Sequence, residues 1–159
     1  MTSFTKSTIG LGLCAAIVAT AAFAGSHASS EAPPAVKARH AQMQVIGYSI
    51  GLLGAVAKGE MEYDAEMVAS AAKNISAMAQ LDRATLWIEG TEQGAVPGSR
   101  AKAEIWSDHD DFAQKFQALA DASAALADAG DAAAVGAGMG DLGGACKACH
   151  EKYRGPKNE

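Results

Sequence analysis

The 159-residue chain is poor in aromatic residues, proline and cysteine, and it has no excess of positive charge. Thirteen Lys and Arg residues stand against 18 Asp and Glu, and the formal net charge of −5 argues against nucleic acid as the main partner. Hydrophobic residues make up 49% and charged residues 19%, which excludes a disordered or fibrous chain. The length therefore predicts one globular domain with a sizeable core.

Two structural patterns are also missing from the sequence. No segment alternates apolar and polar residues with the β-branched enrichment of a strand, and no apolar run reaches the roughly 20 residues of a membrane span. What the chain has in quantity is alanine, with 37 residues, and alanine is the best helix former and a poor strand former. The composition favours an all-α protein with no stable insertion in a membrane.

The N-terminal segment has the order of a secretory signal. Lys6 precedes an almost uninterrupted apolar run over residues 9–24, and no acidic residue lies before or within this run. The run ends in small residues, and residues 22–24 read Ala-Phe-Ala, which is an A-x-A cleavage site. We expect cleavage after Ala24, with cleavage after Ala28 as the alternative. A retained membrane anchor is the weaker alternative, because the run is short for a span of about 20 apolar residues.

This segment predicts the domain organisation and the compartment. Residues 1–24 are expected to be a cleaved signal peptide and residues 25–159 a single domain in the periplasm. Cys14 lies inside the apolar run and is removed with it, so that Cys146 and Cys149 remain. Two cysteines separated by two residues in an oxidising compartment need a chemical explanation.

Four later segments carry inward-facing side chains at intervals of three and four residues, the spacing of one helix face. The first has candidate N-caps at Ser29 and Ser30 and ends at Lys58-Gly59; the second begins near Asp64; the third and fourth span about residues 99–129 and 131–153. The longest loop is marked by Gly90, Gly94, Pro97 and Gly98. Four helices with mostly short connections predict an antiparallel up-down four-helix bundle. The residues expected to face its core are Val36, Arg39, Met43, Ile46, Ile50, Leu53, Ala57, Val68, Ala71, Ile75, Met78, Ile105, His109, Phe112, Phe116, Leu119, Ser123, Leu126, Val135, Met139, Leu142, Cys146, Cys149 and Tyr153.

Three glycines run along the first helical segment, at Gly47, Gly51 and Gly54. Each costs about 1 kcal/mol relative to alanine in a helix, so their presence needs a reason. Either this helix approaches a neighbour closely, or the glycines leave room for something flat and bulky.

The motif that carries chemistry is Cys146-Lys147-Ala148-Cys149-His150, which is the C-x-x-C-H signature of c-type haem attachment. Two thiols at positions i and i+3 lie on one face of a helix, where each can form a thioether with a haem vinyl group. The next residue, His150, can then bind the iron as proximal ligand. The sequence therefore predicts one covalently attached haem c.

Other interpretations of the two cysteines are weaker. A thioredoxin-like C-x-x-C accompanies a βαβ pattern, and the sequence shows none. A zinc site needs four ligands, but the mature chain offers two cysteines and scattered histidines. A disulfide between Cys146 and Cys149 would strain a helix and would leave His150 unexplained.

With these residues in place, the sequence resembles the cytochrome c′ family, the class II c-type cytochromes. The resemblance covers residues 33–154, and the haem motif near the C-terminus is its specific element. The further matches follow in order along the chain: Arg39-x-x-x-Met43, Lys58-Gly59, Tyr63-Asp64, Glu104-Ile105-Trp106 and Tyr153-Arg154. It implies a four-helix bundle with haem c, and it implies a homodimer through the first two helical segments.

The resemblance places Met43 on the distal side of the iron. If its thioether binds the iron, the haem is six-coordinate, and such His/Met ligation suits electron transfer. If Met43 only packs nearby, the haem is five-coordinate, as in the members that bind nitric oxide or carbon monoxide. Because methionine on a helix face is often core filler, both alternatives stay open.

Two arginines are expected near the haem. Arg39 lies one turn before Met43 on the same face, and a buried arginine needs a partner, for which a haem propionate is suited. The alternative is that its side chain reaches solvent. Arg154 lies four residues after His150, and the resemblance implies that it lies on the proximal side. A solvated arginine in the last helical turn is the alternative there.

The remaining candidates are weaker. His40 is rotated off the inward face, whereas His109 falls on it and is expected to be a hydrogen-bonded polar group rather than a ligand. Trp106 and Tyr153 are interpreted as packing residues. The acidic residues around His109 are interpreted as helix-capping or solvated.

The function that we expect is one-electron transfer by a haem c protein, which is a carrier and not an enzyme. Its partners would be redox proteins whose identity the sequence does not indicate. The alternative is a five-coordinate protein that sequesters nitric oxide, with Met43, Ile46 and Phe112 around its distal pocket. A peroxidase would need a distal acid–base residue, and the sequence offers no clear one.

Overall fold

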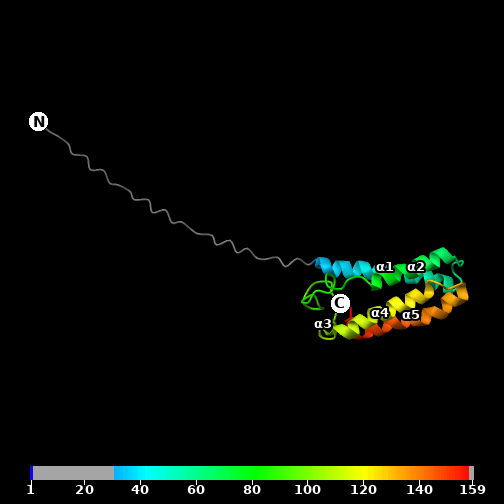
Figure 1. Cartoon of the computed structure of the whole chain (residues 1–159). Helices are drawn as coiled ribbons and strands as arrows, with labels where there is room; N and C mark the ends of the chain where they lie inside the picture. Colours follow the sequence, from blue (N-terminus) through cyan, green and yellow to red (C-terminus); the bar gives the residue numbers. More distant parts are fainter. Residues whose placement is uncertain (2–30, 158–159) are drawn as a thin grey trace.

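The structure, a computed structural model, describes Met1 and residues 31–157. Within this part of the chain, the helices are α1 (Pro34–Ala57), α2 (Ala65–Ala79), α3 (Glu104–Ser107), α4 (His109–Leu126) and α5 (Ala132–Tyr153). Four of them are long and lie side by side along one direction, with the loop between α2 and α4 at one end (Figure 1). The segment assigned to the signal peptide, apart from Met1, lies outside the described residues.

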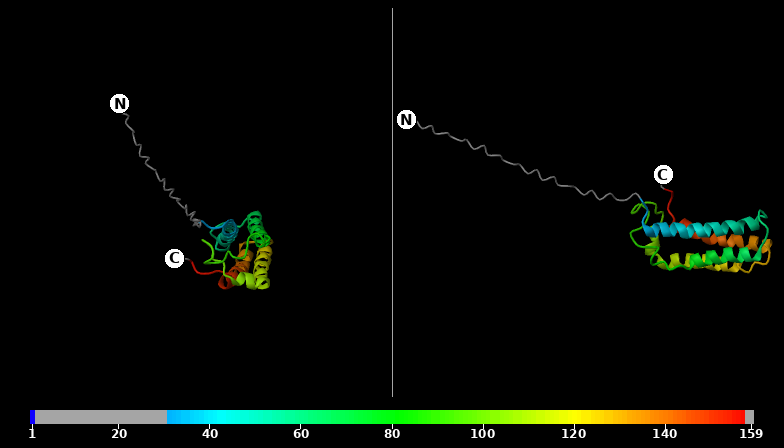
Figure 2. Two further views of the ribbon diagram at one scale, coloured as in Figure 1. Left: turned by 90° about the vertical axis from the view of Figure 1, so that its left-hand side faces the viewer. Right: turned by 90° about the horizontal axis from the view of Figure 1, so that it is seen from above.

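The four long helices close into a bundle. Helix α1 contacts α2 and α5, and α4 contacts the same two helices, so that chain neighbours pack side by side. Short connections join α1 to α2 and α4 to α5 at one end, while residues 80–103 cross the other end (Figure 2). This is the antiparallel four-helix bundle that the periodicity predicts, and the described residues contain isolated β-bridges but no strand.

The helix ends follow the chemistry of their capping residues. Asp64 accepts a hydrogen bond from the Met67 N–H at 2.7 Å, and Asp131 accepts one from the Ala134 N–H at 2.8 Å. Side-chain oxygens at these positions satisfy N–H groups that the first helical turn leaves unpaired. The expected starts of the second and fourth segments are therefore confirmed. The candidate caps Ser29 and Ser30 lie outside the described residues, and α1 instead begins after Pro33.

The third segment differs from the prediction of one helix over residues 99–129. Residues 99–102 are extended, because their backbone groups pair with the C-terminal segment: the Lys102 N–H donates to the Tyr153 carbonyl at 3.0 Å. A single turn, α3, follows and is interrupted at Asp108, whose φ of −132° and ψ of 60° are not helical. Since α4 starts at His109, this histidine is exposed, and its expected place on the inward face is wrong.

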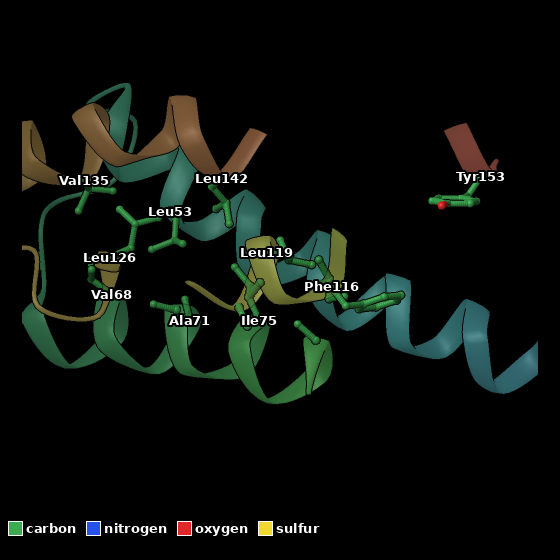
Figure 3. Packing of buried hydrophobic residues seen from close by; sticks show 14 of the residues in the cluster. Leu53, Val68, Ala71, Ile75, Phe116, Leu119, Leu126, Val135, Leu142 and Tyr153 are labelled. Carbon is green, nitrogen blue, oxygen red and sulfur yellow. The ribbon is translucent and has the colours of Figure 1, made fainter. Parts of the chain in front are cut away.

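The core fills the middle of the bundle. Leu53, Ile75 and Leu142 have no exposed surface, and Leu126 is 2% exposed. Each such side chain contributes about 1.5–3 kcal/mol through burial. Figure 3 shows these residues gathered between the helices, with Tyr153 apart from them. Tyr153 lies toward the loop, because its carbonyl accepts the Lys102 N–H. None of the described helices has the length and apolar character needed to cross a bilayer.

Candidate functional site

A cavity of about 470 Å³ lies between α1, α4, α5 and the long loop. Its walls are mostly apolar. They include Ile46 and Ile50 from α1 and Phe112, Phe116 and Leu119 from α4. The cavity lies next to the main core and reaches Tyr153, where the inward faces of α1, α4 and α5 continue without a neighbouring helix to fill the space between them.

One of the three glycines of α1 helps to leave this space open. Gly47 lines the cavity, and a Cβ added there would meet nothing within 4 Å. Gly51 has the same open surroundings, and Gly54 would make only an ordinary contact with the Met139 methyl at 3.9 Å. Within the chain, close helix approach therefore does not explain these glycines. Room for a bulky group explains Gly47.

The haem motif forms the α5 side of the cavity. Cys146, Cys149 and His150 are half-buried and all line it, because positions i, i+3 and i+4 share one face of a helix. Both thiols are free. Burial raises the pKa of Cys149 to about 11 and also raises that of Cys146. At neutral pH the sulfurs are thus uncharged thiols.

His150 is held in its neutral form. Burial lowers the pKa of its imidazole, and the nearby cations of Arg154 and Arg100 lower it further. A neutral imidazole keeps the lone pair that binds a metal ion. Within the described residues no three His, Cys, Asp or Glu side chains converge as a bare metal-ion site requires. A single imidazole beside two thiols is suited to a metal ion that is already bound within a larger prosthetic group.

The other sequence-predicted residues lie around the same cavity. Met43, Arg39 and Arg154 line it together with the haem motif, although Met43 and Arg39 come from α1 and Arg154 from the end of α5. Met43 is half-buried and Arg154 is exposed. His40 also borders the cavity but is exposed, as its position off the inward face predicts. The fold thus brings all six predicted site residues together.

Arg39 is buried against the loop, so its side chain does not reach solvent. It is 4% exposed, and its guanidinium donates to the Thr91 hydroxyl at 3.0 Å, the Thr91 carbonyl at 3.1 Å and the Ser99 hydroxyl at 3.5 Å. The guanidinium carbon also lies 4.9 Å from the centre of the Trp87 ring. These partners are neutral, and among the described residues no carboxylate forms an ion pair with Arg39. Burial lowers the pKa of Arg39.

Comparison with known proteins identifies the family to which this site belongs. Residues 34–154 match the family model described as Cytochrome C'. The chain belongs to the cytochrome c′ family.

The similarity extends over most of the chain. It is 41% identical over 121 residues to a cytochrome c-554 of Cereibacter sphaeroides, covering 75% of this chain and 79% of that protein. Among solved structures, a cytochrome c′ from Rhodobacter Spheriodes superposes with a TM-score of 0.72 at 36% identity, covering 77% of this chain and 96% of that one. A nitric oxide complex of a variant cytochrome c prime from Alcaligenes xylosoxidans has a TM-score of 0.64 at 37% identity, covering 77% and 94%.

Proteins of the cytochrome c′ family carry one covalently attached haem c per chain, and the cavity of this family member fits that group. Its walls are apolar, and two adjacent thiols and a neutral imidazole lie along one side. Among the residues that the structure describes, the buried indole Nε1 of Trp87 has no hydrogen-bond partner, and the neighbouring Arg39 has no ion pair. An unpaired donor next to a cation suits the carboxylates of a haem propionate edge.

The sequence does not predict the three residues that contact the guanidinium of Arg39 in this cytochrome c′ site. Thr91, Ser99 and Trp87 come from the long loop, where no periodicity exists to orient a side chain. Trp87 packs edge-on against Phe112 and Phe116, with ring centres at 4.8 and 6.0 Å. The only signal in the sequence is a tryptophan in an otherwise aromatic-poor chain, and this indicates burial without indicating a position.

The acidic stretch at the start of α4 has a more specific role than solvation. The Tyr153 hydroxyl donates to the Asp111 carboxylate at 2.6 Å, and Lys152 binds Asp111 at 2.9 Å and Asp108 at 2.6 Å. Lys115 lies 3.2 Å from Asp111, one turn further along α4. These bonds hold the end of α5, and with it the haem motif, against the start of α4.

Proposed function

We propose that this cytochrome c′ family member is an electron carrier with a six-coordinate haem, in which His150 is the proximal ligand and Met43 the sixth ligand. The observation that carries this proposal is that Met43 and His150 line one cavity from two different helices. A bound haem c would supply an iron centre that takes up and releases one electron. A neutral imidazole and an uncharged thioether would add no charge to that centre.

The surrounding residues support the same role. Cys146 and Cys149 would hold the group covalently, and the aromatic and aliphatic walls would keep water away from it. Arg39 would bind a propionate while it remains hydrogen-bonded to Thr91. Arg154 would lie on the His150 side, where it lowers the pKa of the imidazole. Such a site moves electrons between redox proteins and does not transform a substrate.

The expected compartment is the periplasm. This part of the proposal rests on the signal-like sequence of residues 1–24, which would leave residues 25–159 as the mature domain. Export would explain the covalent attachment of haem, because a tethered group is retained when the protein unfolds. The partners would be redox proteins of the same compartment.

A second candidate function is binding of nitric oxide or carbon monoxide at a five-coordinate haem. The similar Alcaligenes xylosoxidans protein in complex with nitric oxide favours it. In this chain Met43, Ile46 and Phe112 line the cavity, and their apolar surfaces would admit a small uncharged gas and disfavour polar ligands. In that case Met43 would pack beside the iron without binding it.

Absorption spectra of the purified protein distinguish the two candidates. We expect a low-spin spectrum with the weak Met–Fe(III) charge-transfer band in the ferric state. This band should disappear in Met43→Ala and persist in Met78→Ala, a matched change of a half-buried methionine outside the cavity. A high-spin spectrum in the unaltered protein that shifts readily with carbon monoxide would replace the electron carrier with the gas-binding function.

We also propose that two copies associate through α1 and α2. The outer face of α1 exposes two large apolar side chains, Val45 at 41% and Tyr48 at 69%. Leu81, just after α2, is 39% exposed. Gly51 leaves open space on the same helix, where a neighbouring chain could approach closely. A second copy of this chain would cover these side chains, as the family resemblance implies.

A further inference from the structure

The chain that follows α5 is held against the long loop by a clasp, which we define as loop residues 99–102 and C-terminal residues 153–156. Two backbone hydrogen bonds join these segments, from the Lys102 N–H to the Tyr153 carbonyl at 3.0 Å and from the Gly155 N–H to the Arg100 carbonyl at 2.7 Å. Between them, Ala101 and Arg154 form an antiparallel bridge. The clasp therefore fixes the backbone on both sides of Arg154.

The side chain of Arg100 reinforces the clasp. Its Nε donates to the Gly155 carbonyl at 2.9 Å and to the Pro156 carbonyl at 3.2 Å, and its Nη2 donates to the Gly155 carbonyl at 2.6 Å. These acceptors are backbone carbonyls, so the guanidinium holds the chain through its planar set of donors without neutralising its charge. A lysine at this position would keep the charge but could not reproduce the planar donor geometry.

A second contact fixes the same segment from the loop. The Gln93 side chain donates to the Pro156 carbonyl at 3.0 Å. Gly155 is buried beneath it, and a Cβ on Gly155 would overlap the Gln93 amide. The C-terminal segment is thus confined by Arg100 and by Gln93 together.

The clasp borders the cavity on the side of the haem motif. Arg100, Ala101 and Arg154 line the cavity with His150, and the Arg154 N–H donates to the His150 carbonyl at 3.1 Å. None of the described residues that line the cavity is Asp or Glu. The Arg154 charge is therefore not held in place by a carboxylate at the cavity, and its position depends on where the clasp holds its backbone.

We propose that Arg100 is a positioning residue for the haem site. By donating hydrogen bonds to the Gly155 and Pro156 carbonyls, it fixes Arg154 beside His150. It thereby determines the position of the Arg154 charge on the proximal side. This inference rests on the haem binding and ligation proposed above. It assigns the function of Arg100 to its donor geometry rather than to its charge alone.

The test compares Arg100→Lys, Arg100→Gln and Lys157→Gln in the haem-loaded protein. Hydrogen exchange of the peptide covering residues 153–157, read by mass spectrometry, reports the clasp directly. In both Arg100 variants the amide hydrogens of this peptide should exchange at least roughly tenfold faster. The reason is that each variant loses the hydrogen bonds from the guanidinium to the Gly155 and Pro156 carbonyls. Lys157→Gln removes a charge from the same segment outside the clasp and should exchange as the unaltered protein does.

The reduction potential reports the consequence for the haem. Releasing the Arg154 charge from the proximal side favours the ferric form, so the potential should fall in Arg100→Lys although the charge at residue 100 is kept. In an Arg154→Gln background, Arg100→Lys should no longer lower the potential, because the group through which it acts is gone. Additive effects of the two changes, or unchanged exchange in Arg100→Lys, would overturn the inference.

These outcomes are separate from a failure of the proposed function. If the unaltered protein holds no covalent haem, or if its spectra show five-coordinate iron, the proposed function fails on that observation alone. The exchange measurement on residues 153–157 needs no iron ligation and still decides whether Arg100 holds the clasp. The potential then decides whether the clasp acts on the haem.

Discussion

Asp111 shows how one side chain can hold the haem motif without touching it. Its carboxylate accepts the Tyr153 hydroxyl and lies within ion-pair distance of Lys152 and Lys115. The hydrogen bonds from Tyr153 and Lys152 are the main reason that the pKa of Asp111 lies well below its usual range. The ionised carboxylate is therefore favoured in the folded state, which links the stability of this end of the bundle to pH.

This linkage predicts an acid-sensitive stability. The pKa of Asp111 is lower in the folded than in the unfolded chain. Its contribution to the free energy of unfolding is therefore complete at a pH well above the ordinary pKa of 3.8 and is lost as the pH falls. The free energy of unfolding, measured in urea between pH 6 and about pH 3, should fall less steeply with acidification in Asp111→Asn than in the unaltered protein.

Asp121→Asn is the matched control for this prediction. It removes the same charge from the same helix, at a carboxylate that accepts the Gln117 amide at 2.8 Å on the exposed face. The control should retain the pH dependence of the unaltered protein. Identical slopes for Asp111→Asn and the unaltered protein would show that the Asp111 bonds do not stabilise the folded state.

At the scale of the element, α5 carries glycines with different surroundings. Gly138 faces α4, and a Cβ there would lie 2.5 Å from one methyl carbon of Leu126 and 3.0 Å from its Cγ. Leu126 is 2% exposed, so it has little space into which it could move. At Gly140 a Cβ would meet nothing within 4 Å. Close helix packing therefore explains Gly138 but not Gly140.

We predict opposite effects of alanine at these two positions. Gly138→Ala should lower the free energy of unfolding by about 1–2 kcal/mol, because overpacking against Leu126 outweighs the gain in helix propensity. Gly140→Ala should raise it by up to about 1 kcal/mol, because only the propensity gain applies. Urea denaturation measures both, and a stabilising Gly138→Ala would show that α4 and α5 can separate at little cost.

At the scale of the whole molecule, the bundle leaves an apolar face outside its own core. Val45 and Tyr48 lie on the side of α1 that its two neighbours α2 and α5 do not cover. The cavity opens on the inner side of the same helix, near Met43. Helix α1 therefore separates the proposed haem site from the proposed dimer contact.

The proposed dimer predicts a clear effect of Tyr48→Glu. A carboxylate buried at the contact would remain unpaired, so the dimer dissociation constant should rise at least roughly tenfold. Sedimentation over a range of concentrations measures this constant. Gln114→Glu adds the same charge to the exposed face of α4 and should leave it unchanged. An unaltered protein that sediments only as a monomer at micromolar concentration would contradict the dimer.

Much of this fold follows from local rules that the sequence carries by itself. Asp64 and Asp131 begin helices because a carboxylate beside a first turn can accept its unpaired N–H groups. The inward faces of α1, α2 and α5 follow from the period of 3.6 residues. The haem motif lies on one face of α5 for the same reason. The family resemblance, which the comparisons confirm, identifies haem c as the group that the motif binds.

Other features depend on contacts between segments far apart in the chain. Residues 99–102 are extended and not helical because residues 153–156 offer them backbone partners more than 50 positions away. His109 is exposed at the first position of α4, because the helix is interrupted at Asp108.

Arg39 finds Thr91 and Ser99, and Trp87 reaches the cavity, only once the loop has folded over the end of the bundle. Periodicity describes neighbours within one helix, so the sequence by itself determined the inward faces of α1, α2 and α5. It also determined the caps at Asp64 and Asp131 and the chemistry of the C-x-x-C-H motif. The tertiary structure decided which loop residues surround the haem motif and Arg39. The side-chain directions of these loop residues depend on long-range hydrogen bonds.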